Sequence, residues 1–310
     1  RTRAADRERV DHVERLVELA ARHLQAGEVE RRRQRGGRQD RQLSPLRIAE
    51  DHLCLDLEGN GRRAQPEADR KGKDKIAKIL AKQVEKGKAK ADEVEALLAR
   101  IAPHAMGEAL DGADVVVEAA TENLDVKVAL FKAADAKMRP DAILASNTSS
   151  ISITRLAGQT SRPDRVIGMH FMNPVPLMKL VELVRGVQTS EETYGMIKEL
   201  SEALGKTVIT SKDQPGFVVN RMLVPFLNEA CFALQEGLGT PEDIDQGAKL
   251  GLNHPMGPLE LADLIGLDTL LFIAEVLHRE FGDDKYRPAT LLRNLVAAGW
   301  YGKKVGRGFY

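Results

Sequence analysis

The sequence has few of the residues that would place it in several large classes of protein. Only two of its 310 residues are cysteines, Cys54 and Cys231. Two cysteines provide neither a disulfide framework nor the spacing of a cysteine metal site, so we expect no bound metal. Reduced thiols are typical of cytosolic proteins, and the sequence therefore predicts a cytoplasmic location.

An excess of charge of one sign is also lacking. The 46 Lys and Arg residues balance 46 Asp and Glu residues. A formal charge of zero gives no reason to expect a nucleic acid or an anionic membrane surface as partner. No stretch approaches the roughly 18 apolar residues of a membrane-spanning helix, and the charged first residues do not resemble a signal peptide.

Lysine is missing from the first part of the chain. Residues 1–70 contain 16 Arg and no Lys, and their charged runs show no helix or strand periodicity. A basic disordered tail, a small helical extension around residues 9–25, and out-of-frame translation of a GC-rich gene all fit this composition. We favour the third, because it inflates Arg and suppresses Lys and aromatic residues together. The absence of a first Met fits a truncated or misassigned start.

From residue 71 onward, apolar periodicity alternates between that of strands and that of helices. Continuous apolar runs are typical of buried parallel strands, and spacings of three and four are typical of helices. The alternation predicts an α/β fold with a mostly parallel sheet and helices on both faces. The expected strands are 111–120, 141–150, 164–173, 179–186 and 206–213, and the expected helices are two within 71–101 and one each at 122–138, 151–158 and 190–205.

Strand signals stop after residue 213. Residues 212–216 gather Asp, Gln, Pro and Gly, which marks a boundary between a domain at 71–213 and a second domain at 214–310. The second domain is expected to be all-helical. Asn220 lies in the first turns of its opening helix, where it would face back across a cleft between the domains. The expected helices are 216–237, 240–251, 258–282 and 289–299.

Polar side chains follow the ends of three expected strands. Glu122 comes after the first strand, Asn147 and Ser149 end the second, and His170 is late in the third, followed by Asn173. In open α/β sheets, ligands bind outside the carboxyl ends of the strands. The sequence therefore predicts a site at this edge of the sheet.

A histidine and a carboxylate stand symmetrically about a proline. His170 and Glu182 each lie six positions from Pro176, so a chain that folds back at Pro176 brings them opposite each other. A carboxylate on the far ring nitrogen fixes the tautomer and stabilises an imidazolium. Histidine, with an ordinary pKa of ~6.5, can take or return the hydroxyl proton of a secondary alcohol during hydride transfer. A core histidine without a catalytic role is the alternative, and the placement of Glu182 favours the site.

Six segments of the sequence resemble the 3-hydroxyacyl-CoA dehydrogenase family, and especially its bacterial short-chain members, which act on 3-hydroxybutyryl-CoA. The resemblance extends over residues 71–310. The segments are VVVEAATENLDVK (115–127), SNTSSISI (146–153), GMHFMNPVPLMKLVEL (168–183), DQPGFVVNR (213–221), HPMGPLELADLIGLD (254–268) and GWYGKKVGRGFY (299–310).

This resemblance implies a Rossmann-like domain that binds NAD or NADP, followed by a helical domain that forms a homodimer. The implied substrate is a short-chain (3S)-3-hydroxyacyl-CoA. By the family pattern the catalytic residues are His170, Glu182, Ser149 and Asn220, and the cofactor-binding residues are Glu122, Lys127, Asn147 and Asn173.

One part of the family pattern has no counterpart. The family begins with a strand and a G-x-G-x-x-G turn that seats a pyrophosphate on a helix N-terminus. GNGRRA at 59–64 fits G-x-G-x-x-A formally, but the polar stretch after it, with Pro66, is not the helix that the motif needs. We interpret the match as coincidence and expect that a recognisable first βαβ unit is lacking. A cofactor-incompetent protein that binds acyl-CoA or dimerises is therefore the alternative function.

Overall fold

The computed structural model describes residues 66–87, 89–101, 110, 112–175 and 178–310, with the side chains of 66–72 and 75 left aside. The anomalous segment 1–70 and the GNGRRA match at 59–64 thus lie almost wholly outside the described residues, as does Pro176. The described residues fall into two compact units that divide between Asp213 and Gln214. Each unit is described here by itself.

The first unit contains a five-stranded sheet in the order β1-β2-β3-β4-β5. Neighbouring strands are parallel except for the pair β3 and β4, which is antiparallel. The prediction of a mostly parallel sheet is confirmed. The strands are β1 (Val115–Glu118), β2 (Ile143–Ser146), β3 (Val166–Phe171), β4 (Leu180–Arg185) and β5 (Thr207–Lys212).

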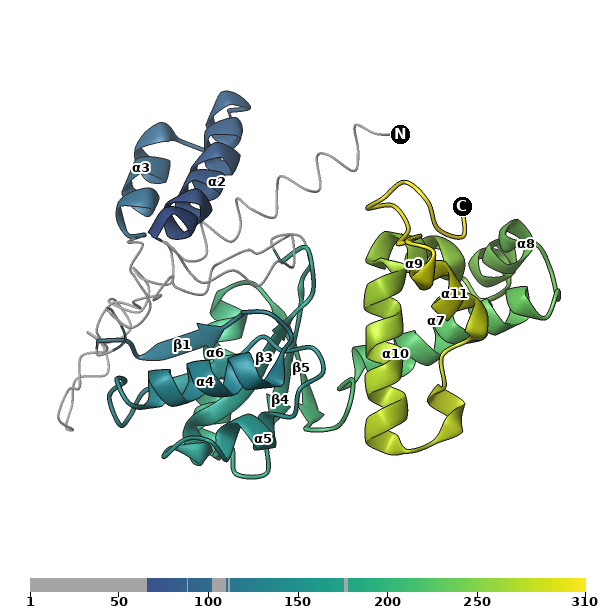
Figure 1. The fold of residues 1–310 in the computed structure, drawn as a ribbon. Helices are drawn as coiled ribbons and strands as arrows, with labels where there is room; N and C mark the ends of the chain where they lie inside the picture. The colour runs from purple at the N-terminus through teal and green to yellow at the C-terminus, as the bar shows by residue number, and fades with distance from the viewer. Residues whose placement is uncertain (1–65, 88, 102–109, 111, 176–177) are drawn as a thin grey trace. The chain divides into compact units, whose positions relative to one another are not determined.

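Helices cover both faces of this sheet. Figure 1 shows α4 (Leu124–Asp135) and α5 (Ile153–Ala157) in front of it, and α6 (Glu191–Ala203) lies behind. Because strand side chains alternate, the odd-numbered residues Ile167 and Met169 pack with Ile197 of α6. The even-numbered residues point to the face of α4 and α5.

Glycine at position 168 lets α5 approach β3 closely. A Cβ there would lie 2.7 Å from Cβ of Val184 and 3.0 Å from the side chain of Ile153, which is closer than van der Waals contact allows. The strands β3 and β4 are thus packed closely against each other and against α5 around Gly168. This packing holds the backbone of the predicted histidine strand in place.

Two further helices precede β1. The helices α2 (Pro66–Glu85) and α3 (Ala91–Ala99) pack on each other, with Leu80 and Val94 buried. They correspond to the helix pair expected within 71–101. None of the described helices is long and apolar enough to cross a membrane.

The second unit is helical, as predicted, around one apolar core. The buried side chains of Leu227, Leu259, Leu270 and Leu277 form its centre. Pro225 lies inside the first helix of this unit. The elements are α7 (Val219–Gln235), α8 (Pro241–Gln246), the π-helical turn η3 (Gly247–Gly251), α9 (Pro258–Ile265), α10 (Leu267–Phe281), the 3-10 turn η4 (Asp284–Tyr286) and α11 (Thr290–Ala297).

The single helix predicted over 258–282 is wrong. The structure has two helices there, because Gly266 adopts a φ of 104° that ends α9 and starts α10. Only glycine reaches such a conformation without strain. The apolar periodicity continues across the break, which is why the pattern alone predicted one helix.

Candidate active site at the carboxyl edge of the sheet

His170 and Glu182 lie opposite each other on β3 and β4. They are directly paired in the antiparallel register, and Nδ1 of His170 lies 2.7 Å from Oε2 of Glu182. The chain therefore folds back as the sequence predicts. Glu182 is fully buried and His170 is 7% exposed. A buried carboxyl group needs a hydrogen-bond partner, and the ring nitrogen of His170 provides one.

The pairing fixes the histidine tautomer. A carboxylate in its ionised form can only accept hydrogen bonds, so such a form of Glu182 would select the tautomer with the hydrogen on Nδ1. The basic lone pair of a neutral ring then lies on Nε2. A positive charge formed on the ring during proton transfer would face a carboxylate that is shielded from water.

The turn after β2 is organised by one carboxylate from the turn after β1. Oε1 of Glu122 accepts hydrogen bonds from the backbone N–H groups of Ser149 and Ser150, at 3.0 and 2.9 Å. It also accepts from the hydroxyls of Thr148 at 2.6 Å, Ser150 at 2.8 Å and Ser149 at 3.4 Å. Two predicted site residues, Glu122 and Ser149, are therefore in direct contact.

Asn147 connects this turn to the histidine strand. Its Oδ1 accepts the backbone N–H of Phe171 at 2.8 Å, one residue after His170. Its own backbone N–H donates to the carbonyl of Glu118 at 2.7 Å. The carboxyl ends of three neighbouring strands are thus joined by residues of one turn, and the predicted gathering of polar residues at this edge is present.

The side chain of Lys127 is buried inside the first unit. It is fully buried on α4, and its ammonium group lies between Glu118 and Glu122, 2.7 Å from the first and 3.6 Å from the second. The structure thus describes Lys127 as a contact of Glu122. A direct contact of Lys127 with a cofactor stays a prediction.

The two predicted asparagines outside this cluster have different surroundings. Asn173 is exposed in the loop after β3 and precedes a cis peptide bond to Pro174. Lys206, directly before β5, contacts this loop. Its ammonium group donates hydrogen bonds to the carbonyls of Val175 and Met178. Burial lowers the pKa of Lys206. Asn220 is half-buried in the first turn of α7 in the other unit, and its expected position facing a cleft between the domains stays a prediction.

Glu118 is a polar residue of this edge that the sequence reasoning did not single out. It is 1% exposed at the end of β1, where it contacts Lys127 and the hydroxyl of Ser146. The signal was present in the sequence, because Glu118 interrupts the apolar run DVVVEAA. Charged residues are almost never fully buried unless they are paired.

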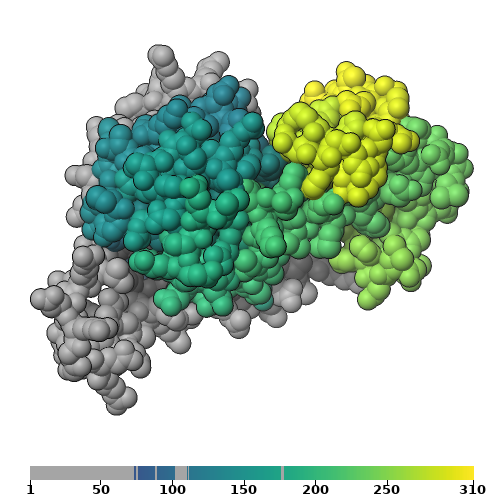
Figure 2. Space-filling model, turned by 90° about the horizontal axis from the view of Figure 1, so that it is seen from below, coloured from purple at the N-terminus to yellow at the C-terminus, as the bar shows by residue number. Residues whose placement is uncertain are grey.

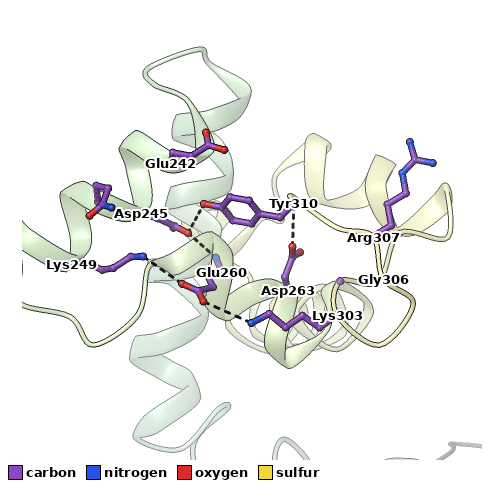
Figure 3. A pocket seen from close by; sticks show the side chains of 11 residues that line it. Glu242, Asp245, Lys249, Glu260, Asp263, Lys303, Gly306, Arg307 and Tyr310 are labelled. Atoms are coloured by element: carbon purple, nitrogen blue, oxygen red, sulfur yellow. Dashed lines mark hydrogen bonds and ion pairs between the residues drawn. The ribbon is translucent and has the colours of Figure 1, made fainter. Parts of the chain in front are cut away.

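A pocket of about 540 Å³ lies in the second unit, with many charged residues in its walls. Figure 3 shows two of its acids in contact with Tyr310: Asp245 accepts from the hydroxyl of Tyr310, and Asp263 accepts from its backbone N–H. Burial and the contact with Asp245 raise the pKa of Tyr310. Glu260 pairs with Lys249 and Lys303 on either side.

These contacts attach the end of the chain to the helices. Asp245 also accepts the backbone N–H groups of Leu259 and Glu260 at the start of α9. In Figure 2 the last part of the chain, drawn in yellow, lies on the surface of the helical unit. No histidine lines this pocket, and two of its acids, Asp245 and Asp263, hold backbone N–H groups of the protein itself.

Other chemistries have little support among the described residues. Burial raises the pKa of the Cys231 thiol to about 12, and the charge of Asp263 adds to the effect. A thiol with such a pKa is protonated near neutral pH and is a poor nucleophile. No group of three or more His, Cys, Asp or Glu in the described part of the chain is arranged to hold a metal ion.

The chain matches two family models in succession. Residues 54–214 match the 3-hydroxyacyl-CoA dehydrogenase, NAD binding domain, and residues 216–310 match the 3-hydroxyacyl-CoA dehydrogenase, C-terminal domain. The first match begins inside the segment 1–70. The two matches meet where the structure divides into its two units.

Curated relatives and solved structures agree with these matches. A probable 3-hydroxybutyryl-CoA dehydrogenase of Bacillus subtilis is 55% identical over 245 residues, which are 79% of this chain and 85% of the relative. The 3-hydroxybutyryl-CoA dehydrogenase of Bradyrhizobium diazoefficiens is 52% identical, over 74% of this chain and 79% of the relative.

Among solved structures, the (S)-3-hydroxybutyryl-CoA dehydrogenase from Ralstonia eutropha is similar with a TM-score of 0.77 and 54% identity. The match covers 79% of this chain and 87% of that one. Two domain models that together span more than half of the sequence, and relatives above 50% identity, agree on one assignment. The chain belongs to the 3-hydroxyacyl-CoA dehydrogenase family.

Proposed function

We propose that this protein oxidises a short-chain (3S)-3-hydroxyacyl-CoA, with 3-hydroxybutyryl-CoA as the preferred substrate, and that His170 is the general base. The observation that carries the proposal is the contact of 2.7 Å between His170 and the buried carboxylate of Glu182. The names of the relatives described above support the choice of a four-carbon acyl group.

In the oxidation, Nε2 of His170 takes the proton of the substrate's C3 hydroxyl. The ring becomes an imidazolium, and its Nδ1–H remains bonded to Glu182. A carboxylate at Glu182, buried beside the ring, would lower the energy of this charged ring relative to a neutral surrounding. In the reverse direction the same nitrogen returns the proton to the oxygen at C3.

Ser149 and Asn220 are assigned to the substrate. The backbone of Ser149 is bonded to Glu122, so its hydroxyl is presented from a fixed turn at the strand ends. We place this hydroxyl on the oxygen at C3. Asn220, from the first turn of α7, would bind the thioester region, as the family resemblance implies.

The residues at this edge fit the nicotinamide end of NAD. Asn147 is half-buried, and its Oδ1 is occupied by the N–H of Phe171, which orients its amide N–H₂ as a donor group. The carboxylate of Glu122 is 24% exposed and provides acceptors beside it. These two residues would hold the nicotinamide and its ribose, and Asn173 is assigned to the same end of the site. When bound, NAD supplies the acceptor for the hydride from C3. The residues assigned here do not distinguish NAD from NADP; by the family pattern, that preference is set in the part of the domain that precedes β1.

We further propose that the helical unit forms the homodimer. Several of its large apolar side chains are exposed, among them Leu250 at 82%, Leu238 at 81% and Met222 at 65%. Isolated apolar residues are normal on a surface, but this unit carries most of the large exposed ones among the described residues. Sedimentation of the full chain should give a dimer, and Leu250→Glu should shift it toward the monomer. A wild-type monomer would contradict this assignment.

The decisive experiment begins with the full chain, NAD⁺ and (3S)-3-hydroxybutyryl-CoA, with NADH formation as the readout. The proposal predicts turnover that is stereospecific for the 3S isomer. A titration of NADH against the same protein separates it from the alternative, a cofactor-incompetent protein that binds acyl-CoA or dimerises. Binding of acyl-CoA without binding of NADH would support the alternative and contradict the proposed oxidation.

A further inference from the structure

A buried ion pair lies directly behind the turn that carries Ser149. Nζ of Lys127 lies 2.7 and 2.9 Å from the two carboxylate oxygens of Glu118, and both side chains are at most 2% exposed. Nζ also donates to the carbonyl of Ala120 at 3.3 Å. The proton transfer proposed above assigns no step to either of these charges.

Glu118 connects this pair to the turn after β2. Its Oε2 accepts the hydroxyl hydrogen of Ser146 at 2.7 Å, and the oxygen of Ser146 in turn accepts the N–H of Thr148 at 3.2 Å. Its Oε1 accepts the N–H of Ala120 at 2.6 Å. These hydrogen bonds hold the backbone N–H of Ala120 and that of Thr148, which is one residue before Ser149.

Lys127 connects the same pair to the turn by a second route. Its ammonium group lies 3.6 Å from Oε2 of Glu122, while Oε1 of Glu122 holds Thr148, Ser149 and Ser150. One cation therefore stands between two carboxylates. Without Lys127, two negative charges would face each other at the strand ends, and repulsion would push Glu122 outward.

The pair is expensive for the protein to bury. Removing two charges from water costs several kcal/mol per ion, and apolar replacements of buried ion pairs are often neutral or stabilising. Stability alone is therefore a weak reason for placing Glu118 and Lys127 here. Geometry is a stronger one, because both routes from the pair reach the turn after β2 and meet at Thr148.

We propose that the buried Glu118–Lys127 pair is a positioning device that sets the location of the Ser149 hydroxyl through Ser146 and Glu122. The inference rests on the proposed function, in which Ser149 binds the oxygen at C3. It makes Glu118 a positioning residue, and it gives Lys127 the task of holding Glu122 in addition to the cofactor contact that the resemblance implies.

The test replaces the pair by neutral groups of similar size, Glu118→Gln together with Lys127→Met. A misplacement of Ser149 by about 1 Å should lower kcat about 100-fold. Because Lys127 also has an expected cofactor contact, the Ser149→Ala background is combined with Ser146→Ala, which cuts only the link from Glu118 to the turn; this change should lower kcat less than about threefold further there, because the positioned group is gone. Additive losses in the two backgrounds would overturn the inference, because the pair would then act on something other than Ser149.

A second readout does not depend on turnover. Hydrogen exchange of the backbone amides of Thr148, Ser149 and Ser150 should become faster in the Glu118→Gln, Lys127→Met protein, since their acceptors are no longer held. Unchanged exchange there would overturn the inference. If the wild-type chain fails to oxidise the substrate, the proposed function fails, while the exchange measurement still tests the positioning.

A matched control is the pair of Asp135 and Arg162, which joins the end of α4 to the start of β3 at the opposite edge of the sheet. Asp135→Asn should lower the melting temperature and leave both kcat and the exchange of 148–150 unchanged. If the double variant does not fold, Ser146→Ala cuts the link between Glu118 and the turn with the ion pair intact. It should speed the exchange of Thr148, whose N–H is bonded to the oxygen of Ser146, and it should lower kcat; unchanged values of both would overturn the inference.

Discussion

Each unit of the protein holds a histidine beside a carboxylate. In the first unit, His170 and Glu182 are 2.7 Å apart, on paired strands, with side-chain exposures of 9% and 0%. In the second, Nε2 of His278 lies 3.1 Å from Asp284, at the end of α10, and the exposures are 36% and 89%. The residue types are the same, but the surroundings are not.

The difference shows what makes such a pair chemically useful. An exposed pair is screened by water and salt, and its partners lose side-chain entropy when they meet, so it contributes little. At His170 the register of two strands fixes the partner, and burial makes the interaction of carboxylate and ring stronger. Both pairs bring a histidine into contact with a carboxylate. The pair of His170 and Glu182 differs in being buried and in having its geometry fixed by two strands.

The largest effect should come from removing each histidine in turn. His170→Gln removes the base and should lower kcat by about 10³-fold or more, which is the range expected for general base catalysis. His278→Gln should leave kcat within about twofold, since that pair is solvent-screened. Steady-state kinetics with 3-hydroxybutyryl-CoA and NAD⁺ measures both. If the two variants lowered kcat equally, the claim that only the buried pair takes part in catalysis would be contradicted.

A smaller, purely structural effect concerns a buried acid that holds the backbone of the protein. Asp263 is as buried as the sheet-edge acids, yet it holds backbone groups at Phe309 and Tyr310. Gly302 and Gly306 both have positive φ, but a Cβ at Gly302 would overlap the main chain of Asp263, while Gly306 faces open space.

Gly302→Ala should therefore destabilise the protein by about 3 kcal/mol, and Gly306→Ala by about 1 kcal/mol, which is the cost of the backbone conformation alone. Denaturant unfolding of the two variants provides the comparison. A similar loss in both would mean that the chain end is not attached through Asp263.

The smallest effect concerns acid stability. Burial pushes the pKa of Asp135 up, but the N–H of Ser161 and the guanidinium of Arg162 outweigh it, so the pKa lies below its usual value of 3.8. A lowered folded-state pKa contributes stability that is present above pH 3.8 and is lost as pH falls through the depressed value. Asp135→Asn should flatten this acid arm of a plot of unfolding free energy against pH. If the unfolding free energy of Asp135→Asn fell with pH as steeply as that of the wild type, other carboxyl groups would account for the loss of stability in acid.

Much of the first unit could be predicted because its pattern is local. Alternating apolar runs gave the sheet and its helices, and equal spacing about Pro176 gave the pairing of His170 with Glu182. The break at Gly266 was missed because apolar periodicity continues across it, although an isolated Gly in a helical pattern is itself a warning.

The interactions that could not be predicted join a side chain to distant backbone. Asp263 accepts N–H groups 46 and 47 residues away, and backbone groups carry no sequence signal. The role of Glu122 as the acceptor for a whole turn was hidden for the same reason. The Glu118–Lys127 pair joins two charged side chains, and a glutamate within an apolar strand was the available sign that one of them is buried.

The central claim is that His170 and Glu182 act as one unit, and a double-mutant cycle tests it most directly. The account predicts that Glu182→Gln lowers kcat less than His170→Gln, and that the two changes together cost no more than His170→Gln alone, since Glu182 acts only through the ring. Losses that multiply in the double variant, or a His170→Gln enzyme within tenfold of the wild type, would contradict it.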